Sequence, residues 1–299
     1  MSRGTSEQTV SKATKEELPR RARGGIGIYA PPGHGKTFAA LTCSAYWEES
    51  RLAMLSSELA KLEPIHLADT LLVAADQGAT DGVRSFRMWP DELDLFMEVA
   101  LDKDGVGGVA ARIVKLLRTH IKPAHRYLVV DTVSQINNWV VQYWDENCPI
   151  TGNGHRDTKA MWPRVEAMLT KFHSAFTMIA AANGMRTIFT YHPVANFAPD
   201  TSSDMGKAAA VAREVGGIEG KMRPSVTGKA YTGYFGAATY MFWLEKRTRM
   251  EGRLQKEERY LVGDSDTHTT KNRLSHLVGN DFRANLRALF KIEGDNIIE

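Results

Sequence analysis

The sequence predicts an α/β fold in which a mostly parallel central sheet is flanked by helices and followed by an antiparallel hairpin near the C-terminus. A glycine-rich phosphate loop at residues 30–37 joins a short apolar run to a helix-forming stretch, which gives a strand–turn–helix unit. Short apolar runs then alternate with helical stretches, as in parallel sheets built from strand–helix–strand units. Beyond residue 236, two apolar runs are connected and flanked by basic residues, and this pattern favours a hairpin.

The expected elements follow one another along the chain. Strands are expected at residues 26–29, 70–75, 127–131, 187–191, 240–243 and 259–262, each centred on a short apolar run. Helices are expected at about 37–60, 90–101, 106–120, 133–146, 157–183 and 280–291. Residues 194–236 are rich in Gly, Ala, Ser and Thr without a clear period, and they are expected to form a long loop. A loop of that length in a compact domain is usually functional or disordered.

The charge distribution separates a leader from the domain. Residues 1–24 carry six Lys or Arg and three Glu, which equals the net charge of +3 of the whole chain. They are also rich in Ser, Thr and Gly, so we expect a disordered leader, and either a nucleic-acid contact or a solubilising role explains its basic character. A single domain is expected over residues 25–291, with a short tail at 292–299.

The bulk composition is that of a globular protein, with 43% hydrophobic and 24% charged residues. No apolar stretch approaches the roughly 18 residues of a membrane span, and the N-terminus lacks a signal-peptide pattern. The cysteines are Cys43 and Cys148, too few for a disulfide framework or a zinc site. We therefore expect a cytoplasmic protein with no membrane partner.

The phosphate loop predicts a site for a nucleoside triphosphate. Gly33 and Gly35 let the backbone curl so that several N–H groups point at one anion, and the helix that follows adds its positive end. Lys36 is expected to reach the β- and γ-phosphates, and the Thr37 hydroxyl to hold Mg²⁺. Ala30 occupies the position of the usual first glycine, which a small residue can replace. The residues expected to contact the nucleotide are Ala30, Pro31, Pro32, Gly33, His34, Gly35, Lys36, Thr37 and Phe38.

Asp131 is the expected second half of this site. It ends the apolar run of the third expected strand, about 95 residues beyond the loop. A carboxylate at the tip of a buried strand beside a phosphate loop can hold the Mg²⁺ shell through water. The pair Asp131–Thr132 resembles the RecA-type ATPases more than the GTPases.

The resemblance to RecA-type ATPases implies roles for two further strand ends. That family carries a catalytic Glu after the strand that follows the phosphate loop, and this chain has none there. Gln77 fits the place by spacing and Asp76 fits it by charge, so hydrolysis is expected to be slow or to use Asp76. The family also places a polar γ-phosphate sensor after the next core strand, where this chain has His192. A histidine that only satisfies the end of its strand is the alternative for His192.

A further motif is similar to the Lys-Asn-Arg motif of RadA-type members of the superfamily. It consists of Lys271, Asn272 and Arg273, after the basic hairpin. The resemblance implies that Lys271 and Arg273 reach the nucleotide of a neighbouring subunit and neutralise charge on the transferred phosphoryl group. An ordinary solvated surface is the alternative.

Together, residues 24–291 resemble the compact RecA-like ATPases encoded by phages, which are linked to single-strand annealing and recombination. The resemblance implies ATP and Mg²⁺ as ligands, single-stranded DNA as a partner, and assembly into a ring or filament. It also implies a single-strand binding or annealing protein as a partner, and the host cytoplasm as the location. The DNA-contacting loop would be residues 194–236, with Tyr231 and Tyr234 available for base stacking, although four acidic residues interrupt it. The basic residues expected to contact DNA are Lys207, Arg213, Lys221, Arg223 and Lys229.

Three other functions share the phosphate loop. A helicase-like or packaging motor or loader would hydrolyse ATP and unwind or move a duplex. A small-molecule kinase usually has an arginine-rich lid, and the Asp131–Thr132 pair argues against it. A nucleotide-binding scaffold without hydrolysis would explain the missing Glu. Stimulation of ATP hydrolysis by single-stranded DNA separates the recombination or annealing ATPase and the motor from the kinase and the scaffold. Duplex unwinding then separates the motor from the recombination or annealing ATPase.

Overall fold

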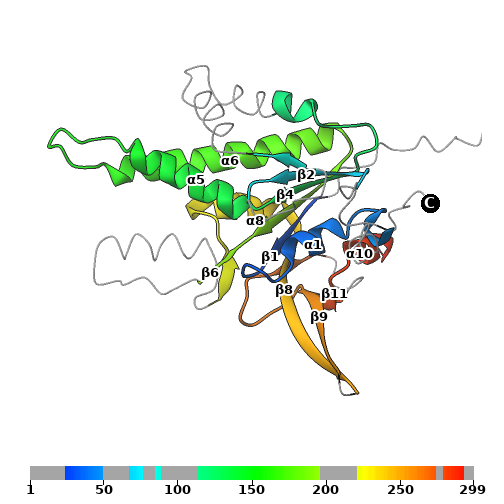
Figure 1. Ribbon diagram of the computed structural model, residues 1–299. Coiled ribbons are helices and arrows are strands. Elements are labelled where there is room, and N and C mark those ends of the chain that lie inside the picture. The colour runs from blue at the N-terminus through cyan, green and yellow to red at the C-terminus, as the bar shows by residue number, and fades with distance from the viewer. Residues whose placement is uncertain are drawn as a thin grey trace, which may run out of the picture.

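The computed structural model describes residues 24–49, 67–76, 85–88, 114–195, 221–252, 254–273 and 279–292. Within these residues the chain forms one large sheet with helices on both faces (Figure 1). No helix in this part of the chain combines the length and the apolar character needed to cross a membrane. The leader up to residue 23, the expected helix at 90–101 and the tail from 293 lie outside the described residues.

The middle of the sheet is parallel. Its strands lie in the order β3 (Ser85–Arg87), β2 (Thr70–Ala74), β4 (Tyr127–Asp131), β5 (Arg186–Tyr191), β1 (Gly25–Tyr29) and β8 (Ala238–Glu251). Every neighbouring pair in this series is parallel, so the carboxyl ends of β1, β2, β4 and β5 meet at one edge of the sheet. The predicted fold class is therefore confirmed. The edge strand β3 was not predicted, because it has only three residues and one of them is apolar.

Adjacent residues along each central strand enter two different cores. Tyr29, Val73 and Val130 face the core that is covered by α5 (Val133–Glu146), α6 (Thr158–Ala182) and α8 (Gly228–Ala237). Their neighbours Ile28, Leu72 and Val129 face the core beneath α1 (Lys36–Leu41) and α10 (Leu286–Ile292). Burial on both faces explains why these strands read as continuous apolar runs rather than as alternating ones.

The two long helices agree with the prediction, and their starts are capped. The side chain of Thr132 accepts a hydrogen bond from the Gln135 amide at the start of α5, and that of Asp157 accepts one from the Ala160 amide at the start of α6.

The expected helix at 37–60 is confirmed at its start but is interrupted early, because α1 ends at Leu41 and helical residues resume only at 47–49. The Thr42 hydroxyl donates to the Ala39 carbonyl, and the Ser44 hydroxyl donates to Asp69, so side-chain bonds replace further helical turns. Residues 50–66 lie outside the described residues.

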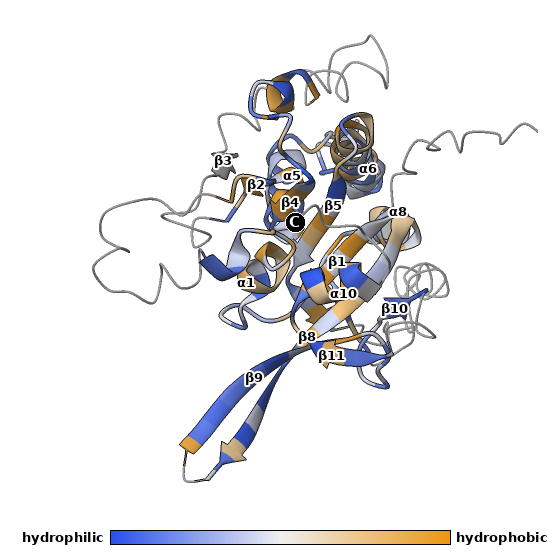
Figure 2. Ribbon diagram, turned by 90° about the vertical axis from the view of Figure 1, so that its right-hand side faces the viewer, coloured by the Kyte–Doolittle hydropathy of each residue, from blue (hydrophilic) through white to orange (hydrophobic). Residues whose placement is uncertain are grey.

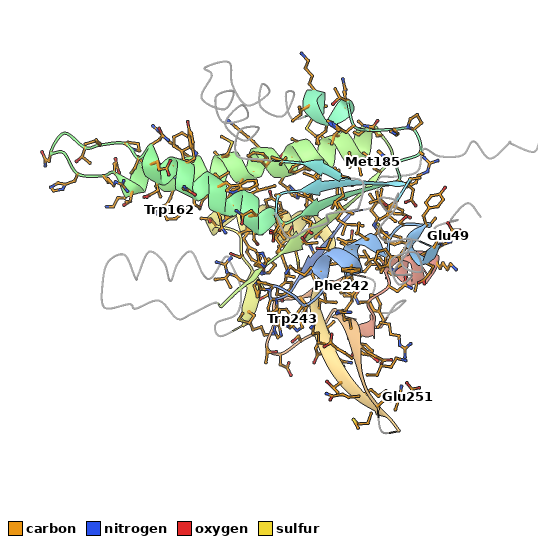
Figure 3. The ribbon with its side chains drawn as sticks, in the orientation of Figure 1. Glu49, Trp162, Met185, Phe242, Trp243 and Glu251 are labelled. Carbon is orange, nitrogen blue, oxygen red and sulfur yellow. The ribbon has the colours of Figure 1, made fainter. Side chains whose placement is uncertain are left out.

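The predicted hairpin is present and is much longer than its apolar runs. β8 pairs antiparallel with β9 (Leu254–Val262) out to the pair Glu251–Leu254, and Gly252 turns the chain with a φ of 64°. The outer part extends away from the sheet and is mostly hydrophilic, apart from the exposed apolar residues Met250 and Leu254 at its far end (Figure 2), near Glu251 (Figure 3). Backbone pairing continues where the apolar pattern stops, because exposed strands with charged side chains still satisfy their ladder hydrogen bonds.

The expected helix at 280–291 was wrong in its first half. β11 (Asp281–Arg283) pairs antiparallel with β9, and α10 begins only at Leu286. The ring of Phe282 packs edge-on against Phe242, with ring centroids 5.2 Å apart. The side chain of Asn285 accepts a hydrogen bond from the Ala288 amide, which fixes the start of the helix there.

The segment 194–236 contains regular structure that the sequence did not predict. β6 (Pro193–Ala195) and β7 (Met222–Pro224) form a separate two-stranded sheet, and α8 follows. Residues 196–220, including Lys207 and Arg213, lie outside the described residues.

Candidate nucleotide-binding site

The phosphate loop leaves the end of β1 and turns directly into α1. Gly33 and Gly35 have φ values of 74° and 86°, in the left-handed region that favours glycine. Gly35 is also the residue that precedes the helix. The two glycines therefore serve the backbone turn that was expected of them.

The ammonium group of Lys36 lies inside this loop. Its Nζ atom donates to the carbonyl oxygens of Ala30 and Pro31 at 2.9 and 3.0 Å, and it lies 3.4 Å from His192 Nδ1. Burial lowers the pKa of Lys36, while Asp131 and Asp76 act in the opposite direction. The lysine is thus a buried cation at the point where a bound phosphate would meet the loop.

Asp131 joins the loop to the sheet. The Thr37 hydroxyl donates to Asp131 Oδ2 at 2.6 Å, and the Thr190 hydroxyl donates to the other carboxylate oxygen. Burial raises the pKa of Asp131, and the two hydroxyl hydrogen bonds and Lys36 oppose this rise. The hydroxyl of Thr37 and the carboxylate of Asp131 are oxygen ligands of the kind that Mg²⁺ prefers.

Asp76 and His192 complete a chain of polar groups that ends on Lys36. Asp76 follows β2 and His192 follows β5, so both lie at the edge of the sheet that carries the loop. Asp76 Oδ2 lies 3.8 Å from His192 Nε2, and His192 Nδ1 faces the lysine. Burial and then Lys36 lower the pKa of His192, and Asp76 raises it, which favours a neutral imidazole near pH 7.

The backbone of His192 is tied to α5 and to the segment that contains β7. The His192 amide donates to Ser134 Oγ at 2.9 Å, and this hydroxyl donates to the Ser225 carbonyl at 3.0 Å. The Ser225 amide returns a hydrogen bond to the His192 carbonyl at 2.7 Å. A movement of the His192 backbone would therefore displace Ser225.

The other predicted loop residues lie around this centre. The side chain of Phe38 is half exposed, and its ring packs edge-on against Trp47. The His34 carbonyl accepts a hydrogen bond from Arg259, which belongs to the hairpin. Gln77 lies outside the described residues, so its place beside Asp76 stays a prediction.

Lys271 and Arg273 bind the end of α8 within their own chain. Lys271 Nζ donates to the carbonyls of Phe235 and Gly236 at 2.7 and 3.0 Å, and Arg273 donates to the Gly236 carbonyl at 3.1 Å. Cations at the carbonyl end of a helix are favourable. This contact gives both residues a role inside the chain, and their expected contact with a neighbouring subunit stays a prediction.

The predicted DNA contacts are described only in part. Lys221 Nζ donates to the Ser265 carbonyl at 2.8 Å, and Arg223 donates to the Val226 carbonyl at 3.0 Å while its guanidinium lies over the Tyr231 ring. The side chains of Lys207, Arg213 and Lys229 lie outside what the structure describes.

The expectation that Tyr231 and Tyr234 are available for base stacking was wrong. Tyr231 is 4% exposed and Tyr234 is 2% exposed, because α8 turns both side chains into the core. The ring of Tyr234 packs against His173, and that of Tyr231 against Phe235.

Sequence reasoning missed Thr190 and Arg259 as parts of this site. Thr190 lies on β5 between two apolar neighbours, and Arg259 is one of many basic residues of the hairpin. The place of Thr190 near the carboxyl end of a fully buried strand, beside the strand of Asp131, was a usable signal for it. Arg259 had no such signal, because only the folding of the hairpin brings it to the loop.

Similarity to known proteins is found among solved structures. No protein-family model and no curated protein matches the chain. Among solved structures, a crystal structure of the RadB recombinase is similar at 12% sequence identity and a TM-score of 0.34, with 83% of this chain and 90% of that chain covered. The interpretation of the site therefore depends on its own geometry.

Proposed function

We propose that this protein is a Mg²⁺-dependent, RecA-like ATPase stimulated by single-stranded DNA, acting as a ring or filament in phage-type recombination or annealing. The observation that carries the proposal is the convergence of three elements on one phosphate loop. Lys36 and Thr37 start α1, Asp131 ends β4, and His192 follows β5, and all four are joined by the contacts given above.

The residues present fit a magnesium nucleotide. The two left-handed glycines shape a backbone cradle, and Lys36 offers three N–H donors, of which two serve loop carbonyls and the third faces His192 Nδ1. Phosphate oxygens would take over as acceptors for these donors. Thr37 and Asp131 would hold Mg²⁺, Asp131 through water, and the ion would supply charge neutralisation on the transferred phosphoryl group.

Asp76 is the residue that we assign to water activation. Its side chain is 40% exposed, so water can reach it, and a carboxylate can accept a proton where the amide of Gln77 cannot. The neighbouring His192, held neutral, can orient the Asp76 carboxylate without adding a positive charge.

A pair of variants tests this assignment. We expect Asp76→Asn to lower ATP turnover about a hundredfold or more, because the proton acceptor is lost. Gln77→Glu should change the rate little. Both rates are measured at saturating ATP with steady-state phosphate release. A large gain of basal rate in Gln77→Glu together with an active Asp76→Asn variant would transfer the role to position 77.

The link from His192 to Ser225 supports coupling to DNA. His192 lies beside Lys36 of the phosphate loop, while Ser134 and Ser225 connect its backbone to the residues between β7 and α8. Lys221 and Arg223 precede Ser225 in this segment, and the proposed DNA contacts include Lys207, Arg213 and Lys229 from the sequence. A DNA strand that moves this segment would shift His192, and through it Lys36.

The test of the function is the ATPase rate with and without single-stranded DNA. We expect addition of a single-stranded oligonucleotide to raise turnover severalfold, and the double-stranded form of the same sequence to raise it less. A rate that DNA leaves unchanged would favour the small-molecule kinase or the non-hydrolysing scaffold. Unwinding of a duplex would favour the helicase-like or packaging motor.

Assembly into a ring or filament, with Lys271 and Arg273 at a subunit interface, is part of the same proposal.

A further inference from the structure

Arg259 connects the long hairpin to the phosphate loop. It lies on β9 opposite Lys246 of β8, near the base of the hairpin. Its Nε atom donates to the His34 carbonyl at 3.0 Å, across 225 residues of sequence. The hairpin is therefore in direct contact with the loop that is proposed to bind the nucleotide.

The loop has room for this contact because position 35 is glycine. A Cβ atom placed on Gly35 would lie 2.8 Å from Arg259 Nε, closer than real Cβ contacts allow. The φ of 86° at Gly35 disfavours other residues as well. Gly35 thus serves both the turn of the loop and the approach of the arginine.

The contact fixes the orientation of one peptide group of the loop. In a trans peptide the C=O and the following N–H point in opposite directions. Since Arg259 holds the His34 carbonyl on the outside of the loop, the Gly35 N–H must point to the opposite side, where anion-binding loops direct their amides. A cation on the carbonyl also polarises the peptide and makes its N–H a stronger donor.

A carboxylate on the same strand moderates this charge. Glu257 Oε1 lies 3.2 Å from Arg259 Nη2 and 3.2 Å from Lys246 Nζ, so one oxygen serves two cations. The same groups reach the loop electrostatically. Burial lowers the pKa of His34. The positive charges of Lys246 and Lys36 lower this pKa further, and the negative charge of Glu257 raises it.

We propose that Arg259 is a positioning residue that holds the phosphate loop in its anion-binding form, and that Glu257 limits its effect. The inference rests on the proposed nucleotide site and identifies a residue from outside the loop motif that sets the loop's affinity for phosphate. Because the Gly35 amide belongs to the loop and not to a γ-phosphate contact, the effect must be equal for nucleoside di- and triphosphates.

The test compares four variants by titration with fluorescent ADP and ATP analogues. We expect Arg259→Gln to weaken binding of both nucleotides about fivefold and by the same factor. Arg259→Lys should recover part of the loss, because it keeps the charge. Glu257→Gln should tighten binding of both nucleotides, the opposite sign. Arg249→Gln is the matched control, since Arg249 is an exposed arginine of the same hairpin, opposite Lys256.

Three outcomes would overturn the inference. The first is unchanged affinity in Arg259→Gln. The second is a loss confined to the ATP analogue, which would make Arg259 a direct γ-phosphate contact. The third is an equal loss in Arg249→Gln, which would indicate a general charge effect.

The Lys36→Ala variant, titrated alongside, separates this inference from the proposed function. If only Lys36→Ala weakens binding, the function stands and the inference fails, whereas wild-type affinity in Lys36→Ala removes the nucleotide site itself.

Discussion

Replacement of Lys36 by alanine should lower ATP turnover about a thousandfold, because the cation nearest the transferred phosphate is lost. Triphosphate binding should also weaken about tenfold or more, since charged hydrogen bonds to the β- and γ-phosphates disappear. The backbone cradle formed around Gly33 and Gly35 would remain, so residual binding is expected. Phosphate release and titration with a fluorescent ATP analogue measure the two effects.

The fold should survive this change. Lys36 is a desolvated cation whose pKa is lowered by burial, so its removal relieves a cost as well as breaking two hydrogen bonds to the loop. The midpoint of thermal unfolding should stay close to that of the wild type. Lys159→Ala, at an exposed position of α6, is the matched control and should leave turnover unchanged. Wild-type turnover in a folded Lys36→Ala protein would exclude the phosphate-loop interpretation.

The second large effect is expected for Asp131→Asn. Turnover at saturating Mg²⁺ should fall by about a hundredfold to a thousandfold, because the carboxylate that would hold the ion is lost. Nucleotide binding in the presence of a chelator should change little, since Asp131 contacts Thr37 and Thr190 and not the loop backbone. Both hydroxyls can accept as well as donate, so an asparagine can keep its hydrogen bonds there. Turnover measured across a Mg²⁺ titration checks the prediction.

Asp69→Asn is the control for this variant. Asp69 is also a buried aspartate, and it precedes β2 at the opposite edge of the sheet, where the Ser44 hydroxyl and the Ala45 amide donate to it. Asp69→Asn should lower the unfolding midpoint without changing the Mg²⁺ dependence of turnover per folded molecule. An Asp131→Asn protein with wild-type Mg²⁺ dependence would separate Asp131 from the metal.

The parts of the site that the sequence predicted are those set by local rules. The phosphate loop is a contiguous motif, and Asp131 follows a buried strand, so strand order alone brings it to the loop. His192 was assigned from the resemblance to RecA-type ATPases, which place a polar residue after the next core strand. The hydrogen bond from Thr190 to Asp131 and the contact of Arg259 with His34 depend on how distant segments pack, and no local pattern encodes them.

The errors in the prediction have the same origin. Residues 228–237 look irregular by composition, yet they form α8, which is stabilised by packing against α6 and by cations at its C-terminal carbonyls. Burial of Tyr231 and Tyr234 follows from that packing and not from their neighbours in sequence. Propensity alone is a weak guide where tertiary contacts determine the outcome.

The presence of a core on each face of the sheet has a consequence for strand register. In a sheet with one solvent-exposed face, a slip of a strand by one residue buries its polar side chains and destabilises the fold. Here Val129 and Val130 enter opposite cores, so within the apolar run of β4 a slip of one residue exchanges one apolar side chain for another. The hydroxyls of Thr37 and Thr190 meet Asp131 in only one alignment of β4 against its neighbours. The carboxylate proposed to hold the metal is therefore also the group that selects the alignment of the sheet.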